Sequence, residues 1–123
     1  MEKQRWREEI VRACQGVGTY RPQFDQVIDT LAGIMEERDK VHEQYIATGA
    51  HPTVIHTNKA KEQNIAKNPM LVMEMDLNTQ ALAYWRDLGL TPAGLRKLNA
   101  QVVEDQRKTG GLEQLLAGLA DAG

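Results

Sequence analysis

The stretch PQFDQVIDTLAGIMEERDKVHEQYIATG, residues 22–49, is a long amphipathic segment in a chain of 123 residues. Pro22 is placed for a first helical turn, Gly49 supplies a stop, and Gly33 is the only weak point between them. The pattern predicts a helix over about residues 22–48, roughly 40 Å long. Its apolar side chains recur at helical spacing: Phe24, Val27, Ile28, Leu31, Ile34, Met35, Val41, Tyr45 and Ile46.

A second long helix is predicted from the NP dipeptide, where Asn68 can cap and Pro69 can take the first helical position. It runs to about Leu88, and its apolar residues cover more than one stripe, which indicates contacts on two sides. The two helices are comparable in length, so we expect an antiparallel helical hairpin. Leu31 and Leu82 are predicted core positions.

The stretch LGLTPAGLRKL, residues 88–98, predicts a corner between the second helix and a third. Gly89 ends one helix, while Thr91 and Pro92 begin the next. Its apolar residues fit a helix-turn-helix, but Trp85 stands where that motif has a small side chain and is expected to hold the helices apart. The plausible base or phosphate contacts of such a motif are Arg96, Lys97, Asn99 and Gln101.

The whole chain is predicted to be all-α, with the long hairpin followed by the corner and by short terminal helices. Residues 1–21 form an N-terminal helical arm in this prediction, with Trp6 and Ile10 on one face. Residues 22–106 form the helical core, and 107–123 a C-terminal tail with a possible short helix around Leu112, Leu115, Leu116 and Leu119. Cys14 is the only cysteine and is expected to be a small buried residue.

Between the two long helices lies AHPTVIHTNKAKEQNIAK, residues 50–67, a long polar crossing loop with only a brief extended stretch, TVIH. Loops of this length usually carry function, contact another chain or are disordered. Residues 49–68 hold three lysines and one glutamate, a net charge of +2, beside the helix 22–48 with six acidic and two basic residues. The predicted DNA-binding residues are therefore Asn58, Lys59, Lys61 and Lys67. The alternative is a solvated loop whose asparagines shape turns.

Composition narrows the function. The net charge of −2 gives no overall attraction to nucleic acid or acidic membranes, so any DNA contact must use a local patch. The apolar runs are too short to span a bilayer and no signal peptide is visible, which predicts a cytoplasmic protein. Because no phosphate-binding, nucleophile or metal motif appears, we predict no catalytic residue, no metal and no cofactor; His51 and His56 lack further ligands.

The order of these features resembles a tailed-bacteriophage terminase small subunit over about residues 20–99. The matching pieces are the acidic helix ending in TG, the crossing HTNKAKEQNIAKNP, the second helix and LGLTPAGLRKL. The resemblance implies a non-enzymatic packaging component in the cytoplasm of an infected or lysogenic bacterial host. It would recognise viral double-stranded DNA, assemble as a homo-oligomer, expected to be a ring, and recruit or regulate the terminase large subunit.

Two other functions fit the residues. One is a dimeric helix-turn-helix-like DNA-binding regulator that acts through the corner, and the other is a helical adaptor without a nucleic-acid role. The mass in solution distinguishes the packaging component from the regulator. A large closed oligomer favours packaging, and a stable dimer with sequence-specific duplex binding favours the regulator.

Overall fold

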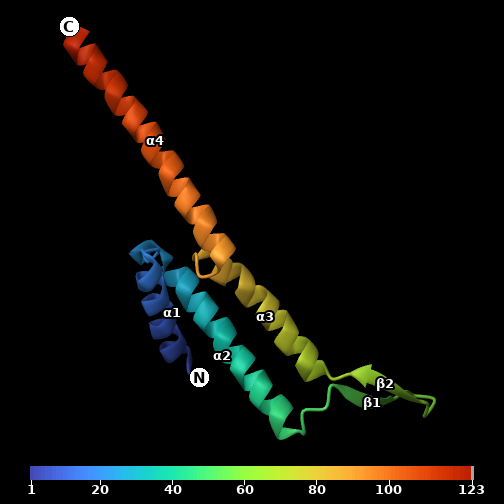
Figure 1. The fold of residues 1–123 in the computed structure, drawn as a ribbon. Helices are drawn as coiled ribbons and strands as arrows, with labels where there is room; N and C mark the ends of the chain where they lie inside the picture. Colours follow the sequence, from blue (N-terminus) through green and yellow to red (C-terminus); the bar gives the residue numbers. More distant parts are fainter. Residues whose placement is uncertain (123) are drawn as a thin grey trace.

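The computed structural model describes residues 1–122, and for residues 112–115, 117 and 119–122 it describes the backbone alone. Four α-helices, one 3-10 helix and two strands succeed one another in the described chain: α1 (Lys3–Val17), η1 (Pro22–Phe24), α2 (Asp25–Ala47), β1 (Thr53–Thr57), β2 (Gln63–Lys67), α3 (Pro69–Asp87) and α4 (Pro92–Ala122). Figure 1 shows α2 and α3 side by side and running in opposite directions, with α1 along the first part of α2. The two strands project from one end of this body, and α4 extends from the other.

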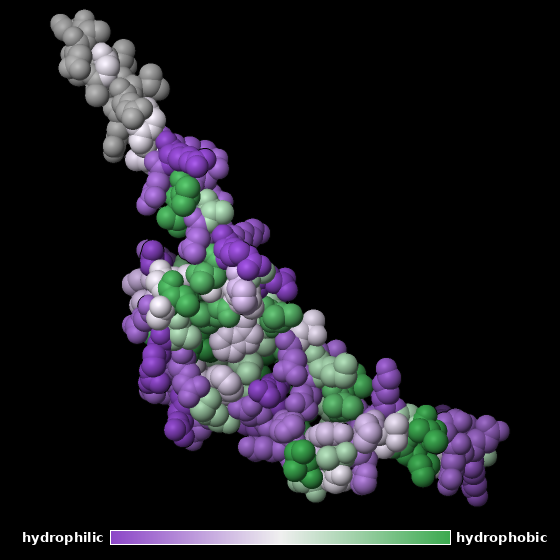
Figure 2. All heavy atoms as spheres, viewed as in Figure 1, coloured by the Kyte–Doolittle hydropathy of each residue, from purple (hydrophilic) through white to green (hydrophobic). Residues whose placement is uncertain are grey.

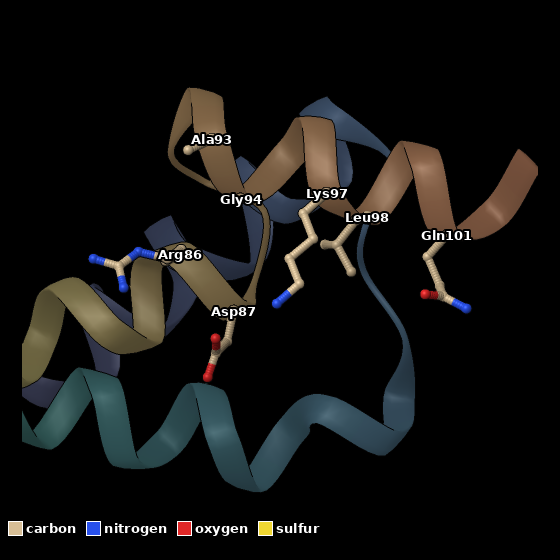
Figure 3. Close-up of a pocket in the computed structure, with 7 residues that line it drawn as sticks. All are labelled: Arg86, Asp87, Ala93, Gly94, Lys97, Leu98 and Gln101. Atoms are coloured by element: carbon tan, nitrogen blue, oxygen red, sulfur yellow. The ribbon is translucent and has the colours of Figure 1, made fainter. Parts of the chain in front are cut away.

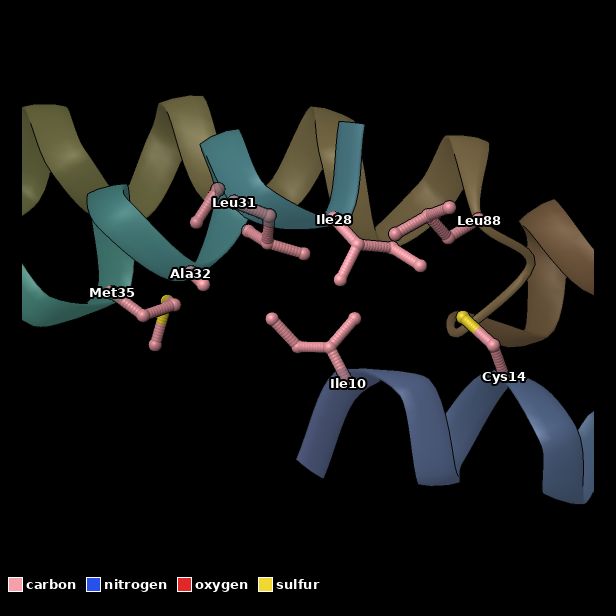
Figure 4. Close-up of a cluster of buried hydrophobic side chains, with 8 residues drawn as sticks. Ile10, Cys14, Ile28, Leu31, Ala32, Met35 and Leu88 are labelled. Carbon is pink, nitrogen blue, oxygen red and sulfur yellow. The ribbon is translucent and has the colours of Figure 1, made fainter. Parts of the chain in front are cut away.

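The core lies where α1, α2 and α3 meet, near the end of the body that carries α4 (Figure 4). Figure 4 shows Ile10 of α1 pointing toward side chains of α2, with Leu88 beyond them at the end of α3. Polar contacts join the same helices: the Thr19 hydroxyl donates to the Leu88 carbonyl at 2.8 Å, and His42 Nδ1 lies 2.9 Å from Glu74 Oε1. The buried members of this core cluster are Ile10, Cys14, Ile28, Leu31, Ala32, Met35, Ala81 and Leu88.

The predicted bounds of α2 and α3 and the predicted start of α4 agree with the structure to within a few residues. Asn68 caps α3 by accepting a hydrogen bond from the Met70 amide at 3.0 Å, with Pro69 at the first helical position. Gly89 ends α3 with a left-handed φ of 74°, and the Thr91 hydroxyl oxygen accepts from the Gly94 amide at the start of α4. Capping chemistry therefore located these helix ends from the sequence.

Of the two predicted core leucines, Leu31 is confirmed and Leu82 is wrong. Leu31 is fully buried, whereas the exposed fraction of Leu82 is 47%. Successive residues of a helix differ by about 100° around its axis. Because Ala81 is the residue of α3 buried against α2, its neighbour Leu82 lies on the outer face.

The all-α prediction is correct for most of the chain and wrong for the crossing loop, which folds as an antiparallel β-hairpin. The strand TVIHT is rich in β-branched residues, but the polar residues after it weaken the alternating pattern that usually identifies a hairpin. No short separate helix forms at the C-terminus, because α4 continues through Gly110 and Gly111 to Ala122. Of the apolar side chains predicted there, only Leu116 lies among the described ones, and it is exposed.

Candidate nucleic-acid interface

The two strands form an arm, residues 53–67, that stands away from the helical body (Figure 1). Their register runs from Thr53 opposite Lys67 to Thr57 opposite Gln63, which leaves residues 58–62 as the loop at the tip. Ile55 pairs with Ile65 on one face of the arm, with exposed fractions of 69% and 79%. Figure 2 shows hydrophilic atoms at the end of the arm and a hydrophobic patch just behind them.

Asn58 shapes the tip of the arm. Its side-chain oxygen accepts hydrogen bonds from the Ala60 and Glu62 amides, each at 3.0 Å. Its backbone amide donates to the Glu62 carbonyl, and its carbonyl accepts from the Lys61 amide. Lys61 has a φ of 59°, a left-handed conformation that is uncommon for a residue with a side chain. These contacts hold a compact turn without a glycine.

Asn68 fixes the base of the arm. It is the one buried polar residue in the described chain, with an exposed fraction of 6%. Its side-chain nitrogen donates to the His51 carbonyl at 2.9 Å, while its backbone amide donates to the Pro52 carbonyl at 2.9 Å. The same side chain caps α3, so one residue closes the arm and begins the following helix.

The four predicted site residues all lie on the arm, but they are not one cluster. Lys59 and Lys61 lie in the tip loop, whereas Lys67 is at the base of β2, roughly 14 Å or more away along the strand. All three lysines are exposed. The Asn58 oxygen is engaged within the turn, and its side-chain nitrogen lies 3.5 Å from Glu62 Oε2. The tip therefore presents two lysines on a turn held by Asn58.

Charge separates the arm from the two long helices α2 and α3. The arm carries three lysines and one glutamate, a net charge of +2. The helix α2 carries six acidic and two basic side chains, and α3 carries three acidic and one basic. A polyanion approaching the protein is attracted by the arm and repelled by the two long helices. Of these three elements, the arm is the one whose charge attracts a polyanion.

The corner between α3 and α4 holds a cavity of about 370 Å³, shown in Figure 3. Figures 1 and 3 agree that α4 leaves the corner in the general direction of α3, whereas the two helices of a helix-turn-helix cross at ~90–120°. Lys97 and Gln101 point to the same side of α4, and Lys97 extends toward Asp87. The residues lining the cavity are Arg86, Asp87, Ala93, Gly94, Lys97, Leu98 and Gln101.

The prediction that Trp85 holds the two helices of the corner apart is wrong. A side-chain carbon added to Gly94 would collide with the Arg86 carbonyl oxygen, so α4 starts directly against the end of α3. Trp85 packs instead on α1, edge to face with Trp6 at a ring-centroid distance of 6.4 Å. The Trp85 indole lies outside the corner because Trp6 of α1 provides an aromatic partner for it.

A family model described as phage terminase, small subunit, matches residues 3–105, most of the chain. The chain belongs to the phage terminase small-subunit family. The sequence resemblance over residues 20–99 is thereby confirmed. The family match also includes α1 and continues along α4 to residue 105. No curated protein and no solved structure matches the chain.

Sequence reasoning missed two features of this terminase small subunit. The first is the β-hairpin, for which the β-branched run TVIHT followed by the turn-forming Asn58 was the available signal. The second is the contact of Asn68 with His51, which joins residues 17 positions apart and has no local sequence signal. Within the described residues no helix is long and apolar enough to cross a membrane.

Proposed function

We propose that this chain is a non-catalytic terminase small subunit that contacts viral double-stranded DNA through its β-hairpin arm. It acts in the cytoplasm of an infected or lysogenic bacterial host, where it recruits or regulates the terminase large subunit during genome packaging. Family membership supports the packaging role. The projecting arm with Lys59 and Lys61 at its tip is the observation that supports the mode of DNA contact.

The shape and charge of the arm suit duplex DNA. The major groove admits a two-stranded β-ribbon, and lysines along such a ribbon can neutralise phosphates on the groove edges. Lys59 and Lys61 would reach phosphates from the tip, and Lys67 would add a contact near the body. In this proposal Asn58 acts mainly by holding the turn that presents the two tip lysines.

One arm is a weak binding site, so the proposal includes assembly with further copies, as a ring. The outer face of α3 supports assembly, because Val72, Met75 and Leu82 lie along one stripe of it and are all exposed. Apolar stripes of this kind commonly mark protein contacts, and a head-to-tail contact closes into a ring when the rotation permits. Repeating the arm around a ring raises the avidity for DNA without any new contact.

The experiment replaces Lys59, Lys61 and Lys67 together with alanine and measures binding to duplex DNA at several salt concentrations. We expect weaker binding and a flatter salt dependence, with the slope of log affinity against log salt reduced by ~0.9 for each phosphate that a lysine no longer neutralises. The oligomeric mass is measured first and should be unchanged, because the three lysines lie outside the helical body.

A matched control replaces Arg96, Lys97 and Arg107 of α4 with alanine, which removes the same charge from exposed positions. It should change DNA binding less than the arm variant. If the arm variant binds as before while the α4 variant loses sequence preference, the corner contacts DNA and the helix-turn-helix-like regulator becomes the better description. If neither variant affects DNA binding, the helical adaptor is favoured.

A further inference from the structure

The part of α4 beyond Leu98, here called its free part, shows no packing against the rest of the chain among its described side chains. Leu95 and Leu98 lie against the corner, close to Gly89, but every residue from 99 to 109 is exposed. The exposed fractions of Val102, Val103 and Leu116 are 51%, 48% and 57%. Figure 1 shows the helix extending far beyond the body, and Figure 2 shows apolar surface on this extension. Most of a helix of 31 residues therefore stands alone in one copy.

Such a helix is unfavourable on its own. An exposed glycine within a helix costs about 1 kcal/mol relative to alanine, and the free part of α4 includes Gly110, Gly111 and Gly118. A side-chain carbon built at any of the three meets no described atom within 4 Å beyond its chain neighbours and the backbone of its own helix. Helices in proteins derive most of their stability from packing of an apolar face. The free part of α4 therefore needs contacts that a single copy does not supply.

The sequence of α4 has the spacing of a coiled coil. From Leu95 to Leu119, eight positions follow one another at alternating intervals of three and four residues. Six of its eight positions are leucine or valine, and two near the middle are polar, which is the pattern of a and d positions in a heptad repeat. The eight positions are Leu95, Leu98, Val102, Asp105, Thr109, Leu112, Leu116 and Leu119.

We propose that the free part of α4 forms a parallel, in-register coiled coil with α4 of a second copy of this chain. The packing at the corner favours this direction. Leu95 and Leu98 are occupied by the corner, so an antiparallel pair would place the C-terminal leucines opposite positions already in use. A parallel pair places the seam positions after Leu98, which the corner leaves uncovered, opposite the same positions of the second copy. It also keeps both bodies at the same end of the pair.

Charge complementarity supports the same register. In this heptad frame Lys108 occupies a g position and Glu113 the e position that follows five residues later. Parallel, in-register helices place a g side chain of one copy beside the next e side chain of the other. Lys108 of each copy would then face Glu113 of the other, giving two opposite-charge contacts. Among the described side chains of its own chain, Lys108 pairs with Glu104, at 4.0 Å across an exposed face.

Asp105 makes the register testable, since the proposed pairing places it opposite the same residue of the second copy. Two carboxylates facing each other across the seam repel, so this layer should weaken the coiled coil. The repulsion would keep the association modest. Asp105→Leu should tighten self-association by about tenfold or more, because it replaces this layer with an apolar contact.

The main experiment is oxidative cross-linking of the full-length chain with a single added cysteine. Leu112→Cys, at a seam position, should cross-link to the same residue of a second copy, whereas Gln114→Cys, at an outer position, should not. The native Cys14 is buried and is not expected to react. Fluorescence of Trp6 and Trp85, both in the helical body, checks that each variant is folded.

Three outcomes would overturn the proposal. If Leu112→Cys links only when mixed with Val102→Cys, the helices are antiparallel. If Leu112→Cys and Gln114→Cys link equally, the contact is a random collision. If neither links and α-helical ellipticity is independent of protein concentration, α4 serves a different partner. None of these results bears on the arm lysines, so they leave the proposed DNA contact intact.

A charge exchange tests the register independently. Lys108→Glu alone and Glu113→Lys alone should each weaken self-association by about 2- to 5-fold, the range for exposed ion pairs. The variant carrying both changes should regain the parent affinity, because the opposite charges face each other again. If the variant with both changes associates more weakly than either single variant, the proposed pairing is contradicted.

Discussion

Leu31 and Leu82 show at the level of single residues which helix faces form the core. Leu31 is fully buried among α1, α2 and α3, whereas 47% of Leu82 is exposed. Leu31→Ala should lower the free energy of unfolding by about 2–5 kcal/mol, because it leaves a cavity in the core. Leu82→Ala removes the same atoms from the surface and should cost less than ~0.5 kcal/mol in a single copy. Urea unfolding of dilute protein measures the free energy of unfolding of both variants. Equal losses of stability would mean that Leu31 does not lie in the core.

Asp39 links the N-terminus to the body and should make stability depend on pH. Burial raises the pKa of its carboxyl, but hydrogen bonds from the Met1 amine at 2.9 Å and from Trp6 Nε1 at 2.7 Å lower it. The positive charges of that amine and of Arg38 lower it further, so the net pKa lies below the ordinary value of 3.8. The unfolded state therefore takes up the proton first as the pH falls.

The stabilisation from Asp39 should be complete above about pH 5 and should disappear as the pH falls through 3.8 and then through the lower pKa of the folded state. Asp39→Asn keeps the shape of the side chain and removes the charge. Urea unfolding of both proteins between pH 3 and 6 should show a difference in stability that shrinks toward acid. A difference that stays constant over this range would contradict the assignment.

The arm depends on Asn58 more than on packing. Nearly all of its residues are exposed, and the Asn58 side chain supplies two of the hydrogen bonds that shape the tip. Asn58→Ala should therefore open the end of the hairpin without changing the thermal midpoint of the helical body. Faster amide exchange at residues 59–66, with α2 and α3 unaffected, would show this. An arm that remains protected would mean that the strands themselves hold the turn.

The same change separates the geometry of the tip from its charge. Asn58→Ala leaves all three lysines in place, so its effect on DNA binding measures how much their arrangement contributes. We expect weaker DNA binding with a nearly unchanged salt slope, because the charges remain available to phosphates. Asn64→Ala, at an exposed strand position of the same arm, is the matched control and should bind as the parent does.

At the scale of the whole molecule, the outer face of α3 is the surface proposed to join copies of the chain. Met75 and Leu82 lie on its exposed stripe, with exposed fractions of 61% and 47%. Replacing both with lysine should lower the oligomeric mass in sedimentation, because charge is costly to bury in an apolar contact. The fold of a single copy should survive, since both residues are outside the core. Met73→Lys with Gln80→Lys, both exposed and on another side of the helix, is the control of equal charge. An unchanged mass in the test variant would exclude this face.

The sequence alone determined α2, α3 and the start of α4. Apolar spacing and the caps at Asn68, Gly89 and Thr91 act over a few neighbouring residues, so α2, α3 and the start of α4 could be predicted from local pattern. The four arm residues were also selected from sequence, because a basic segment between acidic helices is visible in the composition. Their effect on DNA remains a prediction.

Tertiary structure alone decided which face each helix buries and how the crossing folds. Leu82 faces outward because Ala81 permits the close contact between α3 and α2, and Trp85 turns to α1 because Trp6 is there. The hairpin closes through pairs such as Thr53 with Lys67 and through the contact of Asn68 with His51. These contacts join residues 14 to 79 positions apart, and a local pattern cannot specify them because each depends on where the rest of the chain has folded.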